Sequence, residues 1–452
     1  MIKEDFYKKP LWLEFLPGFL KKKIANRPNL QKIVSNINWL FFDKALRMGV
    51  GLFVGVWVAR YLGPSDYGLL NFAIAFTALF GAFAVLGLDG IVIREIVKYP
   101  KLTNEILGSS FGLKLIGGVI AFIISLIAIF LLRPNEPLTI VLVALIAGGF
   151  IFQSINVIDL YFQSQVESKY TVYAQNSAFI IIAIVKIILI LSKASLIVFA
   201  AVGLIEIILA SLFLIIAYTY NHQSIKNWVF RKNRAKELLK DSWPLFLSGI
   251  AIIIYMRIDQ VMLGQMLDEY SVGIYSAAVR ISTVWYFVPM LVVNSVYPLI
   301  IKLQGSNKDL YYARLQKLFT LLVWMSIAIG LTITFMAKFI IIKLYGLPYA
   351  FSADVLIIHI WAGVFVSLGV VSGKWLLLEN LQRYSFYRTL AGAVSNIILN
   401  LWLIPKYGVK GAAFATLMSQ FVAAYCFDAF VPIMRRIFIM KTKSFFWAGL
   451  LR

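Results

Sequence analysis

Apolar stretches of about 20 residues recur along nearly the whole chain, separated by short polar connections. Each stretch is long enough to cross a hydrocarbon layer of about 30 Å as an α-helix. Only 14% of the residues are charged, whereas soluble domains carry about 25%, so the chain has too little polar surface to cover a soluble globule. The sequence therefore predicts an all-α polytopic membrane protein.

The apolar stretches divide into about 12 candidate transmembrane helices. They lie at about residues 35–61, 67–93, 107–132, 137–162, 170–192, 194–219, 242–265, 272–301, 316–342, 353–378, 387–405 and 409–434. Basic segments flank and divide them. The expected organisation is a basic cytoplasmic interfacial arm (1–34), an N-terminal six-helix lobe (35–220), a basic cytoplasmic linker (221–240), a C-terminal six-helix lobe (241–434) and a basic cytoplasmic tail (435–452).

The positive charges are distributed unequally between the two sides of the membrane. With the N-terminus inside, the arm, the linker and the tail hold nineteen Lys and Arg residues, and the six outer connections hold seven. Cytoplasmic loops of membrane proteins carry such an excess. The sequence thus predicts a multi-pass protein of the cytoplasmic (inner or plasma) membrane with both termini in the cytoplasm. The net charge of +22 then needs no nucleic-acid partner to explain it.

Two residue types limit the chemistry of the chain. Cys426 is the single cysteine, which excludes an intrachain disulfide, and two histidines are too few for a Cys/His metal site. No cofactor is expected.

The arm lacks the unbroken apolar core and the cleavage site of a signal peptide. The stretch GVVSGKW at 369–375 departs from a phosphate-binding loop in its glycine spacing and its last residue, so no nucleotide-hydrolysing motif is expected.

A short polar break, Gly63-Pro64-Ser65-Asp66, separates the first two spans. Gly63 can adopt the left-handed conformation that ends a helix, and Pro64 cannot continue one, so an outer hairpin is expected. The residues that match at a constant offset of 205 are Leu62, Gly68 and Ala73 with Leu267, Gly273 and Ala278. This match predicts two parallel repeats, related by an axis along the membrane normal, with a site between them.

Four stretches resemble a known family: ARYLGPSDYGLLNFA, LGQMLDEYSVGIYSAAVRI, DLYFQSQVESKY and NIILNLWLIPKYGVKGAAFAT. They are similar to the polysaccharide-biosynthesis flippases, which move lipid-linked oligosaccharides such as O-antigen units. That family belongs to the exporter superfamily that includes multidrug and toxin extrusion (MATE) transporters and lipid II flippases. The resemblance implies two six-helix lobes of a MATE-like exporter fold, and a central cavity that opens alternately to either side.

A polyprenyl-pyrophosphate-linked oligosaccharide carries its diphosphate across the membrane, which requires cations along a polar path. Arginine suits this task because its planar fork donates paired hydrogen bonds to phosphate oxygens. Arg280 lies about 12 Å inside the outer end of its span, too deep for its charge to reach water easily. Lipid II flippases have an arginine at a matching position in a similar YxAxR-type stretch, and by that resemblance Arg280 is the leading candidate for the pyrophosphate.

Four other cations within predicted spans are candidate site residues. Arg257 is expected either to contact substrate or to pair with a neighbouring helix, and Arg47 either to contact substrate or to pair with Asp43 one helical turn earlier. Lys186 and Lys374 are weaker candidates, and Lys374 could instead reach the inner interface. Asp259 and Asp43 are candidate proton or sodium carriers. Asp89, Glu206 and Asp428 are further possible carriers. For each of these carboxylates the alternative is a structural pair with a cation. His359 is expected to pack between helices.

The sequence thus favours a flippase that moves polyprenyl-pyrophosphate-linked oligosaccharide by alternating access, and not an enzyme. Its expected partners are the substrate and membrane lipids, with a glycosyltransferase or polysaccharide polymerase as a further possibility. One alternative is a cation-coupled multidrug exporter of the same fold, which a cationic cavity argues against. A second is a membrane glycan polymerase or ligase, which usually carries a larger outer loop than the connections of this chain.

Overall fold

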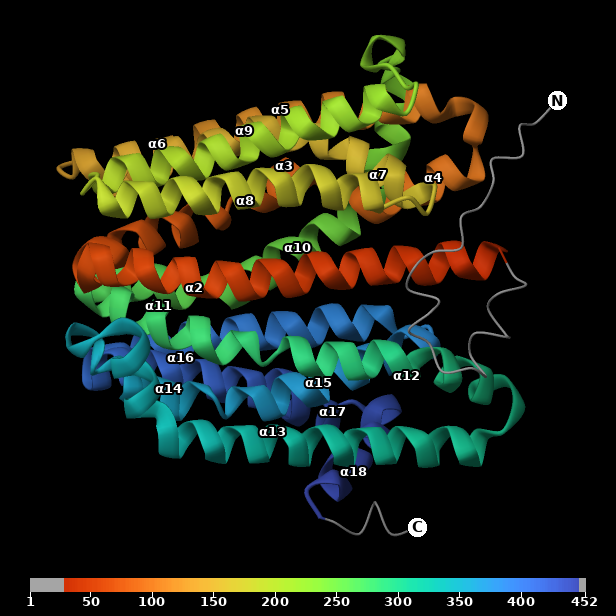
Figure 1. Ribbon diagram of the computed structural model, residues 1–452. Helices are drawn as coiled ribbons and strands as arrows, with labels where there is room; N and C mark the ends of the chain where they lie inside the picture. Colours follow the sequence, from red (N-terminus) through yellow and green to blue (C-terminus); the bar gives the residue numbers. More distant parts are fainter. Residues whose placement is uncertain (1–27, 447–452) are drawn as a thin grey trace.

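A computed structural model describes residues 28–446 of the 452-residue chain. These residues form helices and contain no strand. Most of the predicted arm (1–34) and the last six residues of the predicted tail lie outside the described residues. The fold is all-α (Figure 1), as the sequence predicts.

The helices of the N-terminal half come first in the chain. They are α2 (Pro28–Ala78), α3 (Gly81–Val85), α4 (Asp89–Lys98), α5 (Thr103–Leu132), α6 (Pro137–Phe152), α7 (Val157–Ser164), α8 (Lys169–Leu191) and α9 (Leu196–Tyr220). After α10 (Lys232–Met266), the C-terminal half consists of α11 (Glu269–Val284), α12 (Phe287–Ser306), α13 (Lys308–Tyr345), α14 (Ser352–His359), α15 (Ala362–Leu378), α16 (Gln382–Phe421), the π-helix η6 (Val422–Cys426), α17 (Phe427–Phe430) and α18 (Arg435–Ser444).

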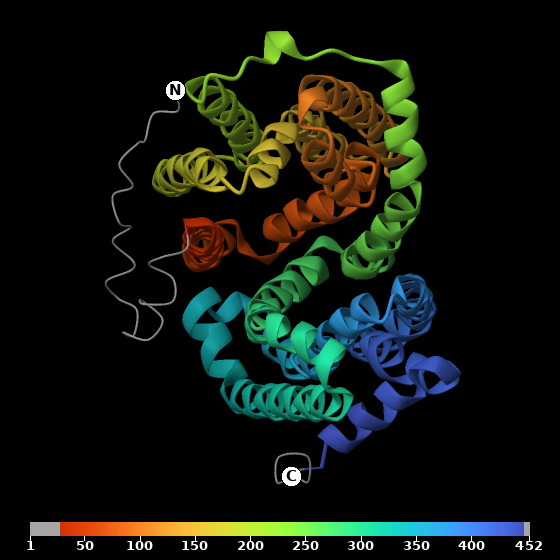
Figure 2. The ribbon, with the colours of Figure 1, turned by 90° about the vertical axis from the view of Figure 1, so that its right-hand side faces the viewer.

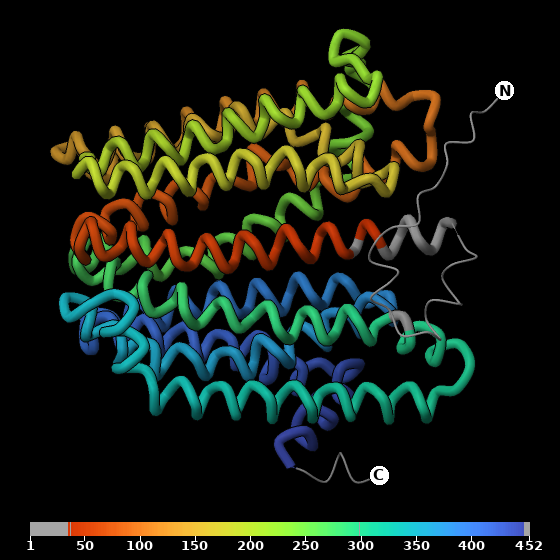
Figure 3. The backbone as a smooth tube through the Cα atoms, viewed as in Figure 1, coloured from red at the N-terminus to blue at the C-terminus, as the bar shows by residue number. Residues whose placement is uncertain are grey.

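Ten helices of the described chain are long and apolar enough to cross a membrane. Two of them, in α2 and α16, contain a glycine with non-helical backbone angles: Gly63 (φ 74°, ψ 171°) and Gly408 (φ 58°, ψ −136°). Glycine tolerates a positive φ because it has no Cβ. The chain of α2 reverses at this point (Figure 3), which confirms the predicted hairpin at Gly63-Pro64. Divided at the two glycines, the ten helices give twelve segments, in agreement with the predicted fold class.

Five of the predicted spans are interrupted within their length, and one of them, 409–434, contains the π-helix η6 and is broken at Val431. The span predicted at 67–93 is broken after Ala78 and again after Val85, and the span at 272–301 is broken at Trp285-Tyr286. The 3₁₀ turn η3 (Gln153–Asn156) interrupts the span at 137–162, and the span at 353–378 is broken at Ile360-Trp361. Phe80 with Trp285, and Ile155 with Ile360, stand 205 residues apart. The breaks therefore recur at the offset that relates the two halves. Hydropathy misses them because the residues at the breaks are largely apolar.

The two halves form separate helix bundles, and α10 passes from one to the other (Figure 2). The predicted linker (221–240) is helical from Lys232 onward. This part of α10 is held on the N-terminal half: Arg94 of α4 pairs with Asp241, and Arg234 lies 3.5 Å from Glu105 of α5. The second part of α10 packs in the C-terminal half against α16. The connection between the halves is thus a helix docked at both ends.

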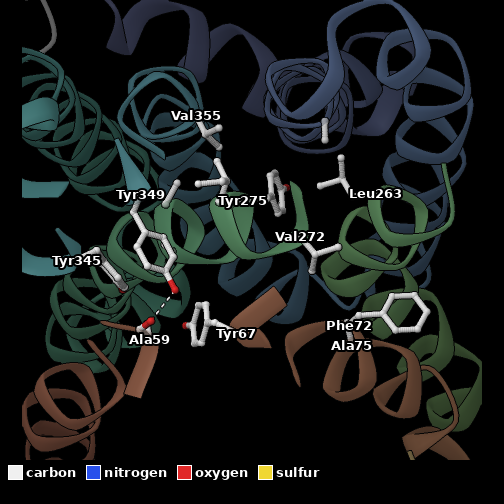
Figure 4. Close-up of a cluster of buried hydrophobic side chains, with 14 of the residues drawn as sticks. Ala59, Tyr67, Phe72, Ala75, Leu263, Val272, Tyr275, Tyr345, Tyr349 and Val355 are labelled. Atoms are coloured by element: carbon white, nitrogen blue, oxygen red, sulfur yellow. Dashed lines mark hydrogen bonds between the residues drawn. The ribbon is translucent and has the colours of Figure 1, made fainter. Parts of the chain in front are cut away.

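The halves pack together at one end of the molecule, here named the hairpin end because the turns at Gly63, Leu267 and Gly408 lie there. One hydrophobic cluster there contains side chains from both halves (Figure 4). Tyr349 of the C-terminal half donates a hydrogen bond of 2.7 Å to the carbonyl of Ala59. At the opposite end, named the basic end for the Lys/Arg-rich segment 226–240, the two large clusters each belong to one half, one of them with the start of α10.

Two glycines related by the 205-residue offset make the closest contact at the hairpin end. A Cβ placed on Gly68 would lie 1.7 Å from the carbonyl oxygen of Glu269, and one placed on Gly273 would lie 1.9 Å from that of Pro64. Any side chain at either position would force the backbones apart. Arg133 joins the halves beside this contact, because its Nη1 lies 2.7 Å from Oε1 of Glu269. The hairpin end is therefore closed.

Candidate functional site

A cavity of about 300 Å³, named here the central pocket, lies between the two halves. Its walls come from α2, α10, α11, α14, α16 and the break between α11 and α12. The lining residues are Tyr67, Asn71, Tyr255, Met256, Arg257, Asp259, Gln260, Tyr275, Ser276, Val279, Arg280, Thr283, Tyr286, His359, Thr416 and Gln420. Three of the predicted site residues, Arg257, Asp259 and Arg280, thus share one cavity.

Arg280 extends from α11 across the boundary between the halves. Its Nη2 donates a hydrogen bond of 2.6 Å to the carbonyl of Gly51 in α2. A Cβ on Gly55 would lie 2.4 Å from the same nitrogen, so the guanidinium occupies the space that a side chain at Gly55 would fill. No carboxylate within the described residues pairs with Arg280. Its remaining N–H donors are free to bind an anion.

Arg257 is the second unpaired cation of the central pocket. It lies on α10 and lines the cavity, and it makes no hydrogen bond or ion pair with any residue in the range 28–446. An unpaired charge at membrane depth is costly, which makes Arg257 a candidate functional residue. The predicted alternative for Arg257, a pair with a neighbouring helix, is not found in the described part of the chain. Two arginines with uncompensated charge therefore face the same cavity.

Asp259 is buried at the wall of the central pocket, with 4% of its surface exposed. Its Oδ2 accepts hydrogen bonds from the Tyr275 hydroxyl (2.7 Å) and the Thr416 hydroxyl (2.6 Å). Its Oδ1 accepts one from the Asn400 amide (2.6 Å). All three donors are neutral, and no basic side chain of the described chain pairs with this carboxylate.

Two further oxygens near Asp259 have no donor. The side-chain oxygens of Gln260 and Asn400 are buried and accept no hydrogen bond within the described residues. Gln260 lines the central pocket, and Asn400 donates to Asp259. Carboxylate and amide oxygens are the ligand types that hard cations prefer, so Asp259 and its neighbours keep the predicted alternative of a proton or sodium site open.

A second cavity, of about 290 Å³, lies within the N-terminal half and is named the N-half pocket. It shares Tyr67, Asn71 and Arg280 with the central pocket, so the two cavities adjoin at these residues. Lys186 of α8 and Glu206 of α9 line it and form an ion pair with an Nζ–Oε2 distance of 3.1 Å. The charge of Lys186 is therefore compensated by a carboxylate.

The remaining predicted site residues lie outside both cavities. Arg47 pairs with Asp43 at 2.7 Å and lies over the ring of Phe179, which agrees with the predicted intrahelical pair. Lys374 lines a different pocket near the basic end.

The other candidate carboxylates are also paired. Asp89 lies 2.5 Å from Lys114, and Asp428 lies 2.5 Å from Lys441 in α18, which is fully buried. These pairs agree with the structural alternative. Lys441 was counted in the predicted basic tail, but it is packed inside the protein because α18 folds back onto α13.

Several residues in or behind the wall of the central pocket carry no recognisable signal in the sequence. Tyr275, Asn400 and Thr416 surround Asp259, although the last two are 141 and 157 residues away in the chain. Asn, Thr and Tyr are frequent at helix contacts in membranes. His359, expected to pack between helices, lines the central pocket and lies 2.8 Å from the Ser282 hydroxyl.

Comparison with protein families gives two matches. The model of a family described as "Polysaccharide biosynthesis protein" matches residues 33–304, more than half of the chain. The MatE family model matches residues 244–402.

Two curated relatives illustrate the first match. The chain is 24% identical to the capsular polysaccharide biosynthesis protein CapF of Staphylococcus aureus, over 90% of this chain and 100% of CapF. It is 32% identical to the probable flippase AglR of Haloferax volcanii, over 40% of this chain and 39% of AglR. CapF therefore matches this chain over its whole length, and AglR over less than half of its length.

Solved structures share the fold. An inward-facing multidrug resistance MATE transporter superposes with a TM-score of 0.72 at 19% identity, covering 88% of this chain and 96% of that one. The lipid II flippase MurJ, in an inward closed conformation, gives a TM-score of 0.71 at 18% identity, covering 91% of each chain. The predicted MATE-like exporter fold is confirmed by these superpositions.

Proposed function

Because the chain belongs to the polysaccharide biosynthesis protein family, we propose that it is a flippase for lipid-linked oligosaccharide in polysaccharide biosynthesis. It is a transporter and not an enzyme, in agreement with the relatives that are named flippases. The substrate is a polyprenyl-pyrophosphate-linked oligosaccharide, which crosses the membrane by alternating access. The cavity between the two halves opens alternately to either side of the membrane.

The observation that carries this proposal is the pair of uncompensated arginines in one cavity between the halves. Arg257 and Arg280 both line the central pocket, and neither pairs with a carboxylate of the described chain. A diphosphate brings about two negative charges, and charge-assisted hydrogen bonds to guanidinium groups are the strong class of such bonds. The polyprenyl chain can remain in lipid while the diphosphate enters the pocket. We assign the diphosphate to these two arginines.

The proposed orientation places the basic end in the cytoplasm. The linker and the predicted tail are rich in Lys and Arg, and cytoplasmic segments carry such residues in excess. The protein would then lie in the cytoplasmic membrane with both termini inside, and its hairpin end would face outward. The conformation described here would be closed to the outside, ready to receive substrate from the inner leaflet.

The proposed coupling site is Asp259. It is the candidate carboxylate without a basic partner in the described chain, and its neighbours Gln260 and Asn400 each carry a buried side-chain oxygen without a hydrogen-bond partner among the described residues. Binding of a proton or sodium ion there would change the hydrogen bonds that join α10, α11 and α16. The ion could thereby bias the packing of the C-terminal half. A binding partner such as a glycosyltransferase or polymerase remains a prediction for the basic arm.

The test is leaflet transfer of a fluorescent polyprenyl-pyrophosphate oligosaccharide in proteoliposomes. Wild-type protein should transfer the lipid, and Arg280→Gln should reduce the rate by about tenfold or more, since one charge-assisted hydrogen bond is worth about 1.5–3 kcal/mol. Arg383→Gln, at an exposed cation of α16, is the matched control and should leave transfer unchanged. No transfer by wild-type protein, across several glycans and imposed ion gradients, would refute the proposal.

The MatE match over residues 244–402 favours a second candidate, a cation-coupled multidrug exporter. Such a protein would use Asp259 to hold a cationic drug or ion, and the two arginines would oppose the cargo. Cells that express the protein would then survive cationic dyes better, and Arg280→Gln would leave this resistance intact. The flippase proposal expects no such resistance.

A further inference from the structure

A separate cavity of about 450 Å³ lies between α10, α15 and α16 and is named the Lys374 pocket. It shares no lining residue with the central pocket. Helix α10 nevertheless contributes to the walls of both cavities: Ser248 lines the Lys374 pocket and Arg257 lines the central pocket. Ser248 and Arg257 are nine residues apart, about 14 Å along the helix, and the nearest lining residues of the two cavities, Ile252 and Tyr255, are about 5 Å apart along it. The Lys374 pocket lies on the side of the central pocket nearer the basic end.

The lining of the Lys374 pocket contains one charge, the Lys374 ammonium, and no carboxylate. The Lys374 nitrogen lies 4.9 Å from the centre of the Tyr297 ring and pairs with no acidic residue of the described chain. Two other donors, the Ser385 hydroxyl and the Gln382 amide, line the same cavity without a hydrogen-bond partner among the described residues. The cavity therefore presents a cation and two uncommitted polar groups.

A second positive charge lies behind the wall of this pocket. Arg388 is buried, with 9% of its surface exposed, and its Nη2 donates to the carbonyl of Gly369, which lines the cavity. Its Nη1 donates to the Ser372 hydroxyl at 2.7 Å. The buried carboxylate of this region, Asp428, pairs with Lys441 instead. Because the surroundings are of low dielectric, the charge of Arg388 adds to the positive potential in the pocket.

Apolar side chains at the same cavity are also exposed. Leu245, Ile252 and Leu377 line it, and each exposes between 46% and 49% of its surface. A cation next to exposed aliphatic side chains matches an amphiphile with a phosphate head and a hydrocarbon chain. A free inorganic anion would use the cation alone.

We propose that the Lys374 pocket is a second binding site for polyprenyl diphosphate, where the diphosphate of the substrate docks before it moves along α10 to Arg257 and Arg280. This inference rests on the proposed flippase function. It separates Lys374 from the arginines with which the sequence grouped it. The Lys374 pocket would be a positively charged binding site for the diphosphate close to the leaflet at the basic end.

The test measures equilibrium binding of glycan-free polyprenyl diphosphate to purified full-length protein. Wild-type protein should bind two equivalents. Lys374→Gln should weaken one of the two sites by about tenfold or more, and Arg257→Gln/Arg280→Gln should weaken the other. Lys374→Arg should keep both sites. Lys302→Gln, at an exposed cation of α12, is the control and should keep both sites.

Ser385→Leu provides an independent variant, because it fills the pocket and removes a donor while the charge at Lys374 is kept. It should also remove one equivalent from protein that elutes as wild type in size exclusion. Unchanged binding of both equivalents by Lys374→Gln and Ser385→Leu would overturn the inference. Displacement of the Lys374-dependent equivalent by a tenfold excess of phosphatidylglycerol would assign the pocket to an ordinary anionic lipid and would also overturn it.

Leaflet transfer measured on the same preparations separates this inference from the proposed function. If wild-type protein transfers substrate but Lys374→Gln binds two equivalents, the second site is wrong and the flippase stands. If Lys374→Gln loses one equivalent but wild-type protein transfers no oligosaccharide, the site stands as a lipid-phosphate site and the flippase proposal fails.

Discussion

The central pocket and the N-half pocket adjoin at Tyr67, Asn71 and Arg280, yet their charges are arranged in opposite ways. In the N-half pocket the cation Lys186 is neutralised by Glu206. In the central pocket Arg257 and Arg280 have no carboxylate partner within the described chain. Depth in the membrane alone therefore does not identify an anion site. A cation can attract a diphosphate only when its charge is not already compensated.

The largest effect is expected from removing both charges of the central pocket. Arg257→Gln/Arg280→Gln should reduce leaflet transfer by about 100-fold or more, since each charge-assisted hydrogen bond is worth about 1.5–3 kcal/mol. The proteoliposome transfer assay measures this change, with the melting temperature of the detergent-purified protein as the check on folding. If the folded double variant transferred substrate at a rate within threefold of wild type, the assignment of the diphosphate to the two arginines of the central pocket would be contradicted.

A smaller effect is expected at Asp259. Asp259→Asn should reduce gradient-driven transfer by about tenfold, to the rate without a gradient, because the amide cannot take up a proton or balance a sodium ion. The amide oxygen can still accept from Tyr275 and Thr416, and Asn400 can turn its own oxygen toward the new amide. Binding of the diphosphate should therefore persist. Transfer that still follows the imposed gradient in this variant would exclude Asp259 as the coupling residue.

Gly55→Ala should disturb the shared boundary of the two pockets more mildly. The new Cβ would lie 2.4 Å from Nη2 of Arg280, so the guanidinium must move and lose its bond to Gly51, while the backbone can stay in place. Diphosphate binding should weaken about threefold. Gly203→Ala is the matched control, because it lines the N-half pocket and a Cβ there has no atom within 4 Å. Equal affinities of the two variants would argue against the position assigned to Arg280.

The smallest effect on transfer is expected from the N-half pocket. Lys186→Met/Glu206→Gln should keep transfer within about twofold of wild type, since the pair is already neutral. Lys186→Met alone should lower stability by about 1–3 kcal/mol, because it leaves Glu206 unpaired at a site where each side chain is 26% exposed. Thermal unfolding in detergent measures the difference between the single and double variants. A large loss of transfer in the stable double variant would make Lys186 part of the substrate site.

The sequence predicted the features that depend on local chemistry. The hairpin at Gly63-Pro64 follows from the conformations of these two residues, and the pair of Arg47 with Asp43, one of the two alternatives given for these residues, follows from their spacing on one helix. The 205-residue offset was visible in three matched residues and recurs in the helix breaks.

The parts that the sequence did not predict depend on tertiary contacts. The group around Asp259 joins helices far apart in the chain, and its members are ordinary residues for a membrane helix. The separation of Lys374 from Arg257 and Arg280 also required the arrangement of α10, α15 and α16. Depth along a helix was predictable for every cation, but the partner of each cation was not, unless the partner lay one turn away.

The most direct test of the central claim is to locate the bound diphosphate. A polyprenyl diphosphate with a photoreactive group next to the phosphate can be crosslinked to wild-type protein in proteoliposomes and the labelled peptides identified by mass spectrometry. Labelling of α10 and α11 around Arg257 and Arg280, lost in the double arginine variant, is the result expected here. Labelling concentrated on α8 and α9 around Lys186 and Glu206, and unchanged in that variant, would contradict the assignment of the diphosphate to the central pocket.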